Sequence, residues 1–444
     1  MFTEDFMPAV LGDVARKNAA LLGDAVAVHF EGRDTTFAQF DRHTNQVANG
    51  LIALGVAPQK HVAYLGKNSD LYFELFFGAA KARAIIAPIN WRLAPPEIAF
   101  IINDCQADVL FVGPEFLDGV KALAGELKSV RHIVSMEGAT LEWQDFSKWR
   151  DAQSADVPDR VAKEDDVAIQ LYTSGTTGHP KGAMLINRNL LGMRQRDPSD
   201  TRQWNVASAD DVWLVPMPVF HIGGSGVLVW AAWSGGKCVI TREFNPVTIL
   251  DDFVAHKVSK LFLVPAAMQF IVRLPQARQV DFSRLKFLMY GASPIPLDLL
   301  RECMDVFKCG FVQMYGMTET TGTIVALEPE DHTPEGSPRM RSSPSTWSSG
   351  GNATMVPVVS VMPYICTKPH LKTSMHSFSS AAGIGEAPYS MYFSREKSTC
   401  RARGCRTTNC IAAGTMNSLV MPDCSKKSST LVGSNSRAIT PLAP

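Results

Sequence analysis

Between residues 211 and 317 the chain alternates short apolar runs with amphipathic stretches. The apolar runs at 211–218, 237–241, 260–265, 286–292 and 310–317 predict buried strands. Apolar positions recur at helical spacing over 246–256 and 296–307, and Asn245 with Pro246 forms a typical helix start. Strands that alternate with helices of about 10–15 residues predict an α/β fold, with layered, mostly parallel sheets flanked by helices.

The same style continues less regularly through residues 11–165, where the polar segment 137–162 predicts a connection, and it stops after Ser342. Residues 343–444 hold 10 of the 43 Lys and Arg residues but only 3 of the 43 Asp and Glu residues. The neutral total therefore hides an acidic body and a basic, Ser-rich tail without apolar periodicity, which predicts poor order. We expect two subdomains, 1–165 and 166–342, and a tail, 343–444.

One polar run, Tyr-Thr-Ser-Gly-Thr-Thr-Gly-His-Pro-Lys-Gly at 172–182, follows the strand-like segment 167–172 and precedes a helix-like stretch that starts near Asn187. A strand, a Gly/Ser/Thr loop and a helix are typical of phosphate binding, because glycines let backbone N–H groups face an anion. The spacing differs from the GxxxxGK[ST] P-loop. The predicted phosphate-contact residues are Thr173, Ser174, Gly175, Thr176, Thr177, Gly178 and Lys181.

A second motif, Gln-Met-Tyr-Gly-Met-Thr-Glu-Thr at 313–320, follows the apolar residues 310–312. Together the two motifs resemble the adenylate-forming (AMP-binding) superfamily, of the acyl-CoA synthetase or fatty-acid–CoA ligase type. The resemblance implies that Tyr315 stacks on adenine beside Gly316 and Met317, that Thr318 faces the phosphates and that Glu319 holds Mg²⁺. A flat aromatic face suits a purine, and a carboxylate suits a hard cation.

Weaker matches fall in the same order along the chain at 216–223, 263–268 and 290–294, and upstream at 36–40, 45–51, 87–93 and 103–111. The resemblance implies that His221 lines an acyl pocket, and that Gly291, Ala292 and Ser293 lie against adenine and the acyl carboxylate. The alternatives are a core histidine with satisfied hydrogen bonds and an ordinary turn after a strand. The resemblance covers about residues 11–342.

The family activity is ATP-dependent activation of a carboxylic acid to an acyl-adenylate, followed by transfer to coenzyme A. It implies ATP, Mg²⁺ and coenzyme A as cofactors or co-substrates, a small-molecule carboxylate as partner, and catalytic roles for Lys181, His221, Thr318 and Glu319. The apolar segment 219–233, with Trp230 and Trp233 three residues apart, favours a fatty acid. An aryl acid stays open, as does the alternative that both tryptophans belong to a helix core.

After Ser342 the family's ribose-binding aspartate, hinge and catalytic lysine cannot be assigned. We hypothesise a frame change, because codons for residues 425–434 read two bases later permit Lys-Glu-Ile-Ile-Asn-Ser-Gly-Gly-Glu, which resembles the family's post-hinge motif. A genuine alternative C-terminus is the rival. Either way we expect the chain to bind ATP weakly and to form little or no acyl-CoA. The alternative function is a non-catalytic nucleotide-binding remnant or an interaction protein.

The remaining features give weaker expectations. The acidic start of the chain has no secretory signal pattern, and no run of about 18 apolar residues predicts a membrane span, so we expect a cytoplasmic protein. The body cysteines lack metal-site spacing and predict buried thiols. Basic residues in the tail are not interleaved with aromatics, so nucleic-acid binding is not expected. The body cysteines are Cys105, Cys238, Cys303 and Cys309.

Overall fold

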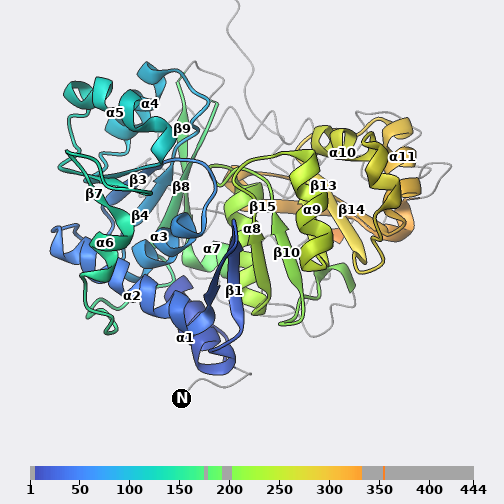
Figure 1. Ribbon diagram of the computed structural model, residues 1–444, viewed down its shortest axis with the longest axis horizontal. Coiled ribbons are helices and arrows are strands. Elements are labelled where there is room, and N and C mark those ends of the chain that lie inside the picture. Colours follow the sequence, from blue (N-terminus) through green and yellow to red (C-terminus); the bar gives the residue numbers. More distant parts are fainter. Residues whose placement is uncertain (1–5, 175–178, 193–202, 333–353, 356–444) are drawn as a thin grey trace, which may run out of the picture. The chain divides into compact units, whose positions relative to one another are not determined.

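The computed structural model describes residues 6–174, 179–192, 203–332 and 354–355, all within the larger of two compact units, residues 1–386 (Figure 1). The expected tail, 343–444, lies outside these residues except for one short strand. The elements are, in chain order, α1 (Leu11–Leu22), β1 (Val26–Phe30), β2 (Arg33–Thr36), α2 (Phe37–Ala53), β3 (His61–Leu65), α3 (Asp70–Lys81), β4 (Ile85–Pro88), α4 (Pro95–Asp104), β5 (Val109–Val112), η1 (Pro114–Phe116), α5 (Leu117–Leu123), η2 (Ala124–Glu126), β6 (His132–Ser135), β7 (Gln144–Asp145), α6 (Phe146–Asp151), β8 (Val167–Thr173), β9 (Lys181–Ile186), α7 (Asn187–Gly192), η3 (Gln203–Asn205), β10 (Val212–Val215), α8 (Ile222–Ser234), β11 (Lys237–Ile240), α9 (Pro246–His256), β12 (Lys260–Leu263), α10 (Pro265–Val272), η4 (Pro275–Gln279), β13 (Phe287–Gly291), α11 (Leu297–Phe307), β14 (Gly310–Met317), η5 (Thr318–Thr320), β15 (Gly322–Leu327), η6 (Pro329–Asp331) and β16 (Thr354–Met355).

The strands form two sheets. Sheet A has the order β16-β15-β14-β13-β12-β10-β11-β1-β2, and sheet B has the order β7-β6-β5-β3-β4-β8-β9. Neighbouring strands run parallel except at β1–β2, β8–β9, β14–β15 and β15–β16, which are antiparallel. The expected α/β fold of mostly parallel sheets flanked by helices is therefore confirmed, with antiparallel additions.

The two sheets exchange strands along the sequence. β1 and β2 precede all of sheet B in the chain but pair into sheet A, where β1 runs parallel to β11. β8 and β9 follow residue 165 but belong to sheet B. Neither sheet is thus built from one side of residue 165 alone, and the expected division into subdomains at that residue stays a prediction.

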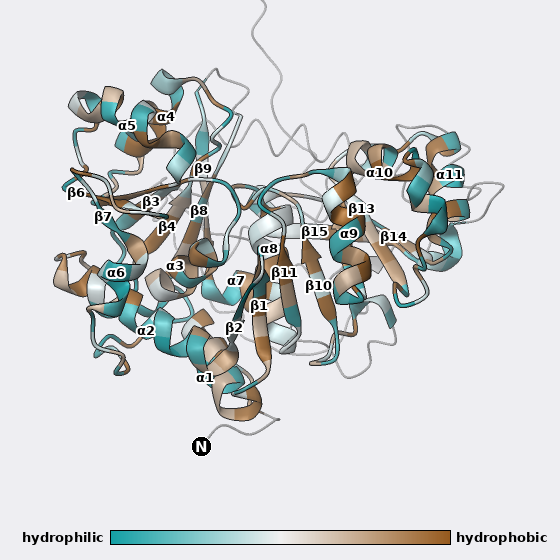
Figure 2. Ribbon diagram, in the orientation of Figure 1, coloured by the Kyte–Doolittle hydropathy of each residue, from teal (hydrophilic) through white to brown (hydrophobic). Residues whose placement is uncertain are grey.

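Helices cover both faces of each sheet. Along β3, Val62 and Tyr64 join the core that includes α2 and α3, while Ala63 and Leu65 join the core beneath α4 and α5. Sheet A behaves likewise, with α8 on one face and α9, α10 and α11 on the other. Figure 2 shows the same pattern, with hydrophobic strands between helices that carry both hydrophobic and hydrophilic residues. Burial on both faces explains the continuous apolar runs of the sequence.

Most predicted elements of the second half are confirmed. Strands β10 to β14 each lie within their apolar run, and α9 spans the predicted residues 246–256. The Asn245 side chain accepts hydrogen bonds from the backbone N–H groups of Val247 and Thr248, as an N-cap does. α10 begins at Pro265, two residues after the last residue of β12.

The expected order of strand, phosphate loop and helix is wrong in one respect. Residues 181–186 form the strand β9, which pairs antiparallel with β8, so the Gly/Ser/Thr segment joins two strands of a hairpin. The helix α7 begins at Asn187 as predicted, but only after β9. Of the predicted phosphate-contact residues that the structure describes, Thr173 and Lys181 therefore lie in strands and not at a helix N-terminus.

Trp230 lies in the core, since its side chain is buried and its ring centroid lies 4.9 Å from that of Trp213. Trp233 packs partly buried against the same core cluster. The helix-core alternative for this pair is therefore the one observed. Cys105, Cys238 and Cys303 are buried free thiols as expected, whereas Cys309 is partly exposed.

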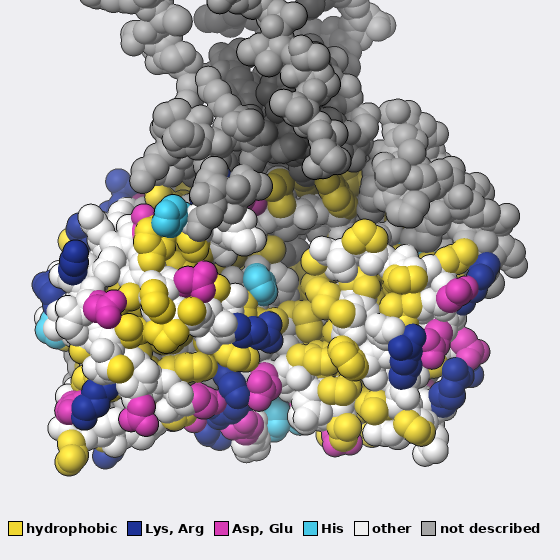
Figure 3. Space-filling view, turned by 90° about the horizontal axis from the view of Figure 1, so that it is seen from above, with side chains coloured by type: hydrophobic (Ala, Val, Ile, Leu, Met, Phe, Trp, Pro, Cys, Tyr) yellow, Lys and Arg dark blue, Asp and Glu magenta, His cyan; other side chains and the backbone are white. Residues whose placement is uncertain are grey.

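Two surface properties complete the fold. In the described part of the chain, no helix is both long and apolar enough to cross a membrane. Large hydrophobic side chains are exposed on α9 and α10, namely Val247, Val254 and Phe270. Figure 3 shows hydrophobic side chains gathered over much of one face of the molecule, with charged side chains of both signs among them.

Candidate nucleotide site

The stem of the β8–β9 hairpin places two predicted phosphate contacts side by side. Thr173 and Lys181 are register partners at the loop end of the hairpin. Ser174 is exposed directly after β8. No ion pair joins the Lys181 ammonium to a carboxylate among the described residues. The predicted contacts Gly175, Thr176, Thr177 and Gly178 lie outside the described residues.

The hairpin of sheet B meets the second motif, which belongs to sheet A. The Thr173 hydroxyl donates a hydrogen bond to Oε1 of Glu319 over 3.3 Å. Glu319 lies in η5, the short turn after β14. The structure therefore brings together two motifs that are 146 residues apart in the chain, as the resemblance implies.

The turn that carries Thr318 and Glu319 is fixed from within. The Thr320 hydroxyl accepts a hydrogen bond from the Met317 backbone N–H over 3.1 Å and lies 2.8 Å from the Gly322 carbonyl. A Cβ atom at Gly316 would overlap the Gly322 carbonyl oxygen, so this position admits only glycine. Thr321 has φ of 60°, a left-handed conformation that closes the turn.

The ends of β13 and β14 lie side by side. Gly291 is the register partner of Met314, and a Cβ atom at Gly291 would overlap the Met314 carbonyl oxygen. Ala292 follows with φ of 70°, a strained conformation for a residue with a side chain, and Ser293 is exposed. Tyr315 is partly exposed beside them, and partial burial raises the pKa of its phenol. The tyrosine is therefore uncharged at neutral pH.

His221 is the N-cap residue of α8 and is exposed, which excludes the alternative of a core histidine. Its ring centroid lies 4.5 Å from that of Phe220, and the Arg92 guanidinium carbon lies 5.8 Å from the Phe220 centroid. Desolvation, and then the charge of Arg92, lower the pKa of His221. A Cβ atom on Gly322 would lie 3.7 Å from Cγ1 of Ile222, so the start of α8 lies next to the turn after η5. The acyl-pocket role of His221 stays a prediction.

Asn68 holds the segment that leads to His221, and the sequence reasoning missed it. Its side chain is 2% exposed and donates to the carbonyl oxygens of Met217 (3.1 Å) and Thr241 (3.0 Å). It also accepts a hydrogen bond from the Val219 N–H over 3.0 Å. All three backbone groups belong to sheet A or its loops, whereas Asn68 follows β3 of sheet B. A lone asparagine after a strand carries no sequence signal for such a role.

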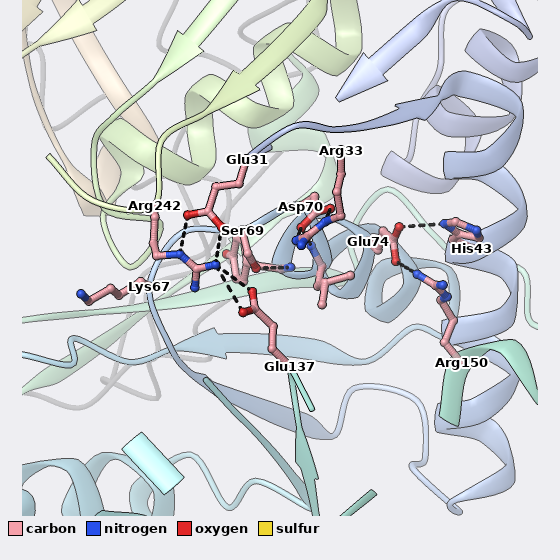
Figure 4. Close-up of polar contacts among 12 residues, drawn as sticks. Glu31, Arg33, His43, Lys67, Ser69, Asp70, Glu74, Glu137, Arg150 and Arg242 are labelled. Carbon is pink, nitrogen blue, oxygen red and sulfur yellow. Dashed lines mark hydrogen bonds and ion pairs between the residues drawn. The ribbon is translucent and has the colours of Figure 1, made fainter. Parts of the chain in front are cut away.

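Close to Asn68, ion pairs also join the two sheets (Figure 4). The Arg242 guanidinium donates to both carboxylate oxygens of Glu31 over 2.7 Å and to those of Glu137 over 3.1 and 3.3 Å. Arg33 donates twice to Asp70, over 2.9 and 3.1 Å. The hydrogen bond from Arg242, its largest cause, lowers the pKa of Glu31. We call these five residues the ionic junction.

The donor set fits a magnesium nucleotide. Hydroxyls of Thr173 and Thr318, the Lys181 ammonium and the Glu319 carboxylate are groups that bind phosphates and Mg²⁺. No cluster of three or more His, Cys, Asp or Glu side chains suited to a metal occurs among the described residues. A cation held by Glu319 would therefore take phosphate oxygens or waters as its other ligands.

Comparisons with known proteins agree with this arrangement. The family model for "AMP-binding enzyme" matches residues 15–345. The chain is 36% identical to the fatty acid–[acyl-carrier-protein] ligase ScoC of Streptomyces coeruleorubidus, over 70% of this chain and 59% of that protein. It is 33% identical to a feruloyl-CoA synthase of Amycolatopsis sp, over 72% of this chain and 61% of that protein. The matches therefore span about three fifths of these relatives.

Solved structures give the same fold. The inhibitor-bound N-terminal domain of FACL13 from Mycobacterium tuberculosis superposes with a TM-score of 0.67 at 26% identity, covering 74% of this chain and 80% of that one. The anthranilate CoA ligase AuaEII in complex with anthranoyl-AMP superposes with a TM-score of 0.69 at 26% identity, covering 74% of this chain and 64% of that one.

Proposed function

Because this chain belongs to the family of AMP-binding enzymes, we propose that it binds MgATP between the β8–β9 hairpin and η5 and uses it to activate a carboxylic acid as the acyl-adenylate. The acyl group then passes to a thiol, that of coenzyme A. The single observation that carries the proposal is the hydrogen bond between Thr173 and Glu319, which joins the two nucleotide motifs while the Lys181 ammonium has no carboxylate partner among the described residues.

The residues would act mainly by neutralising charge, because a carboxylate and a triphosphate must meet in this step. Thr173 and Lys181 would hold phosphate oxygens, and Tyr315 would lie against the purine beside Gly291 and Ala292. Mg²⁺, held by Glu319, would supply positive charge to those oxygens. The neutral ring of His221 would line the acid pocket without adding a charge there.

We propose an apolar acid, and a fatty acid first. The apolar segment 219–233 and the relationship to a fatty acid–[acyl-carrier-protein] ligase support this choice. The aromatic rings of Trp91, Phe220 and His221, which lie near one another, favour an aryl acid as the second candidate. A relationship to a feruloyl-CoA synthase supports that candidate too.

We also propose that this chain binds nucleotide but catalyses the formation of acyl-CoA only weakly. The support is that the family match ends at residue 345, and that residues 346–444 carry no recognisable counterpart of the family's catalytic lysine. Loss of such a cation at the α-phosphate would cost about 3–4 kcal/mol if it resembles a lost oxyanion donor. A non-catalytic nucleotide-binding protein is the limiting case of this proposal.

The proposal is tested by calorimetric titration of the purified chain with MgATP, together with Lys181→Ala. We expect binding by the parent and a dissociation constant at least about tenfold higher for the variant, because a charge-assisted contact to phosphate is lost. Lys128→Ala is the matched control, since Lys128 is exposed and only its backbone N–H takes part in a hydrogen bond among the described residues. A parent that gives no heat with MgATP refutes the nucleotide site.

Activity is tested separately by pyrophosphate release with fatty and aryl acids, and by thioester formation with coenzyme A or a carrier-protein thiol. We expect pyrophosphate release well below that of full-length relatives, with apolar acids preferred. Rapid thioester formation by the purified chain would refute the proposal of weak turnover while leaving the nucleotide site intact.

A further inference from the structure

The β8–β9 hairpin extends beyond the rest of sheet B. β9 is an edge strand, and β8 pairs with its other neighbour, β4, at Ile86 and Ile169. Residues 171–173 of β8 lie past this pair, and Thr173 faces Lys181 at the loop end of the hairpin. A two-stranded ribbon outside a sheet is only marginally stable by itself, so something else must fix the position of these two side chains.

Helix α4 contacts strand β8 and the residue that lies two positions before β9. The Tyr172 hydroxyl donates a hydrogen bond to Oδ2 of Asp104 over 2.7 Å. In the segment that leads into β9, the ring of His179 stacks on Phe100, with centroids 5.2 Å apart and an angle of 27° between the planes. Tyr172 directly precedes Thr173, and His179 lies two residues before Lys181.

The spacing on α4 makes this double contact possible. Phe100 and Asp104 are four residues apart and therefore share one face of the helix. Other α4 residues, Ile98, Ile101 and Ile102, are buried in the core under sheet B, which anchors the helix. Phe100 is 36% exposed, a large apolar ring whose stacking partner among the described residues is His179.

The chemistry of the hydrogen bond suits a fixed contact. Burial, which is the largest cause, raises the pKa of Tyr172, so the phenol stays a donor throughout the accessible pH range. The Gln170 amide also donates to the Tyr172 hydroxyl, over 3.4 Å. The tyrosine is thus held from its own strand and from α4 at once.

We infer that Phe100 and Asp104 are positioning residues for the nucleotide site: through His179 and Tyr172 they set where Thr173 and Lys181 stand. The inference rests on the proposed function, because it assigns these two residues to the binding of the same triphosphate. Neither residue contacts the nucleotide itself. Their effect should therefore fall on the outer phosphates and spare the nucleoside.

The test measures dissociation constants for MgATP and for AMP with the full chain and the variants Phe100→Ala and Asp104→Ala. We expect each variant to weaken MgATP binding by about three- to tenfold, the size of one hydrogen bond or ring contact, with AMP binding unchanged. Phe100→Trp and Asp104→Asn retain a ring and an acceptor, and should restore most of the affinity. Phe270→Ala, an exposed aromatic on α10, and Asp118→Ala, an exposed carboxylate on α5, are the matched controls.

A double-mutant cycle and a spectroscopic signal separate positioning from a general loss of stability. Tyr172→Phe combined with Asp104→Ala should be no worse than either change alone, because both remove the same bond. The ring proton of His179 should resonate upfield in the parent and lose that shift in Phe100→Ala.

The outcomes distinguish the two proposals. If the parent binds MgATP and both alanine variants bind it equally well, or if MgATP and AMP weaken together, the positioning role is refuted and the proposed function stands. An unshifted His179 proton in the parent also refutes it. If the parent does not bind MgATP, both proposals fall.

Discussion

Two of the polar contacts between the two sheets, among the described residues, are built very differently. At the ionic junction and Asn68, charged groups and a buried amide make hydrogen bonds of 2.9–3.3 Å across the boundary, and Asn68 is almost fully buried. At the nucleotide site, one hydrogen bond of 3.3 Å joins Thr173 to Glu319. The first contact is saturated with protein partners, whereas the second keeps a lysine, a carboxylate and hydroxyls for something else.

This difference separates stability from function. Groups that already have partners contribute to holding the sheets together but have little left for a ligand. Groups at the nucleotide site contribute little to stability, since a single part-buried hydrogen bond of this kind is worth about 1 kcal/mol. A protein can therefore lose the second contact and stay folded, whereas losing the first should loosen the whole boundary.

Asn68→Ala should have the largest effect on stability. It leaves the Val219 N–H and two carbonyl oxygens without their partner in a buried place, at a cost of about 3 kcal/mol in the free energy of unfolding. Denaturant unfolding measures this loss. Asn49→Ala is the control, because its two hydrogen bonds are exposed and should cost about 1 kcal/mol or less. Equal losses in the two variants would contradict the importance of this boundary.

Arg242→Met should come next, with a loss of about 2 kcal/mol, because Glu31 and Glu137 keep their charges without the shared partner. The loss should shrink in high salt. The control is Lys121→Met, which breaks the exposed pair with Glu142 and should leave the free energy of unfolding nearly unchanged. MgATP affinity should be nearly unchanged in both variants. A large fall in MgATP affinity for Arg242→Met alone would contradict the view that the ionic junction serves stability and not nucleotide binding.

Thr173→Val should give the reverse result. The unfolding free energy should change by about 1 kcal/mol or less, while the dissociation constant for MgATP should rise about fivefold, because a donor near the phosphates is lost. Thr248→Val, at an exposed position on α9, is the control and should alter neither quantity noticeably. A variant that unfolds easily but binds normally would show that this contact is structural.

Glu31→Gln should have the smallest effect, a slight loss of stability at neutral pH and a weaker dependence of stability on pH. The folded state holds the pKa of Glu31 below the ordinary value of 4.5, so its contribution to stability is present above that pH and is lost as the pH falls through the lowered pKa. The variant should therefore lose slightly less stability than the parent between about pH 5 and pH 3. Parallel stability curves would contradict a charged role for this carboxylate.

Much of the second half could be predicted because its signals are local. Strands buried on both faces give continuous apolar runs, and Asn245 with Pro246 marks the start of α9 by a cap that needs no distant partner. The motif residues around Tyr315 and Glu319 followed from the family resemblance. The resemblance also implied that the two motifs lie together, and the structure adds the contact itself, between Thr173 and Glu319 across 146 residues.

The failures have physical reasons as well. β9 escaped prediction because Lys181-Gly-Ala-Met-Leu-Ile is short, contains a glycine and shows no alternation of apolar and polar residues. The exchange of β1 and β2 into sheet A depends on pairing with β11, more than 200 residues later in the chain, for which no local signal exists. Asn68 and Asp104 look like ordinary polar residues after a strand and at a helix end.

Crowding of the main chain at Gly291 and Gly316 constrains any attempt to redesign this protein for a different nucleotide. A carbonyl oxygen occupies the space that a side chain would need at each position, so neither can be randomised in a library. Ala292, whose backbone already tolerates a left-handed turn at some cost, is a better place for change, beginning with glycine. Within the proposed nucleotide site, Ser293 and Tyr315 are the positions to vary for base specificity, and the two glycines should be left alone.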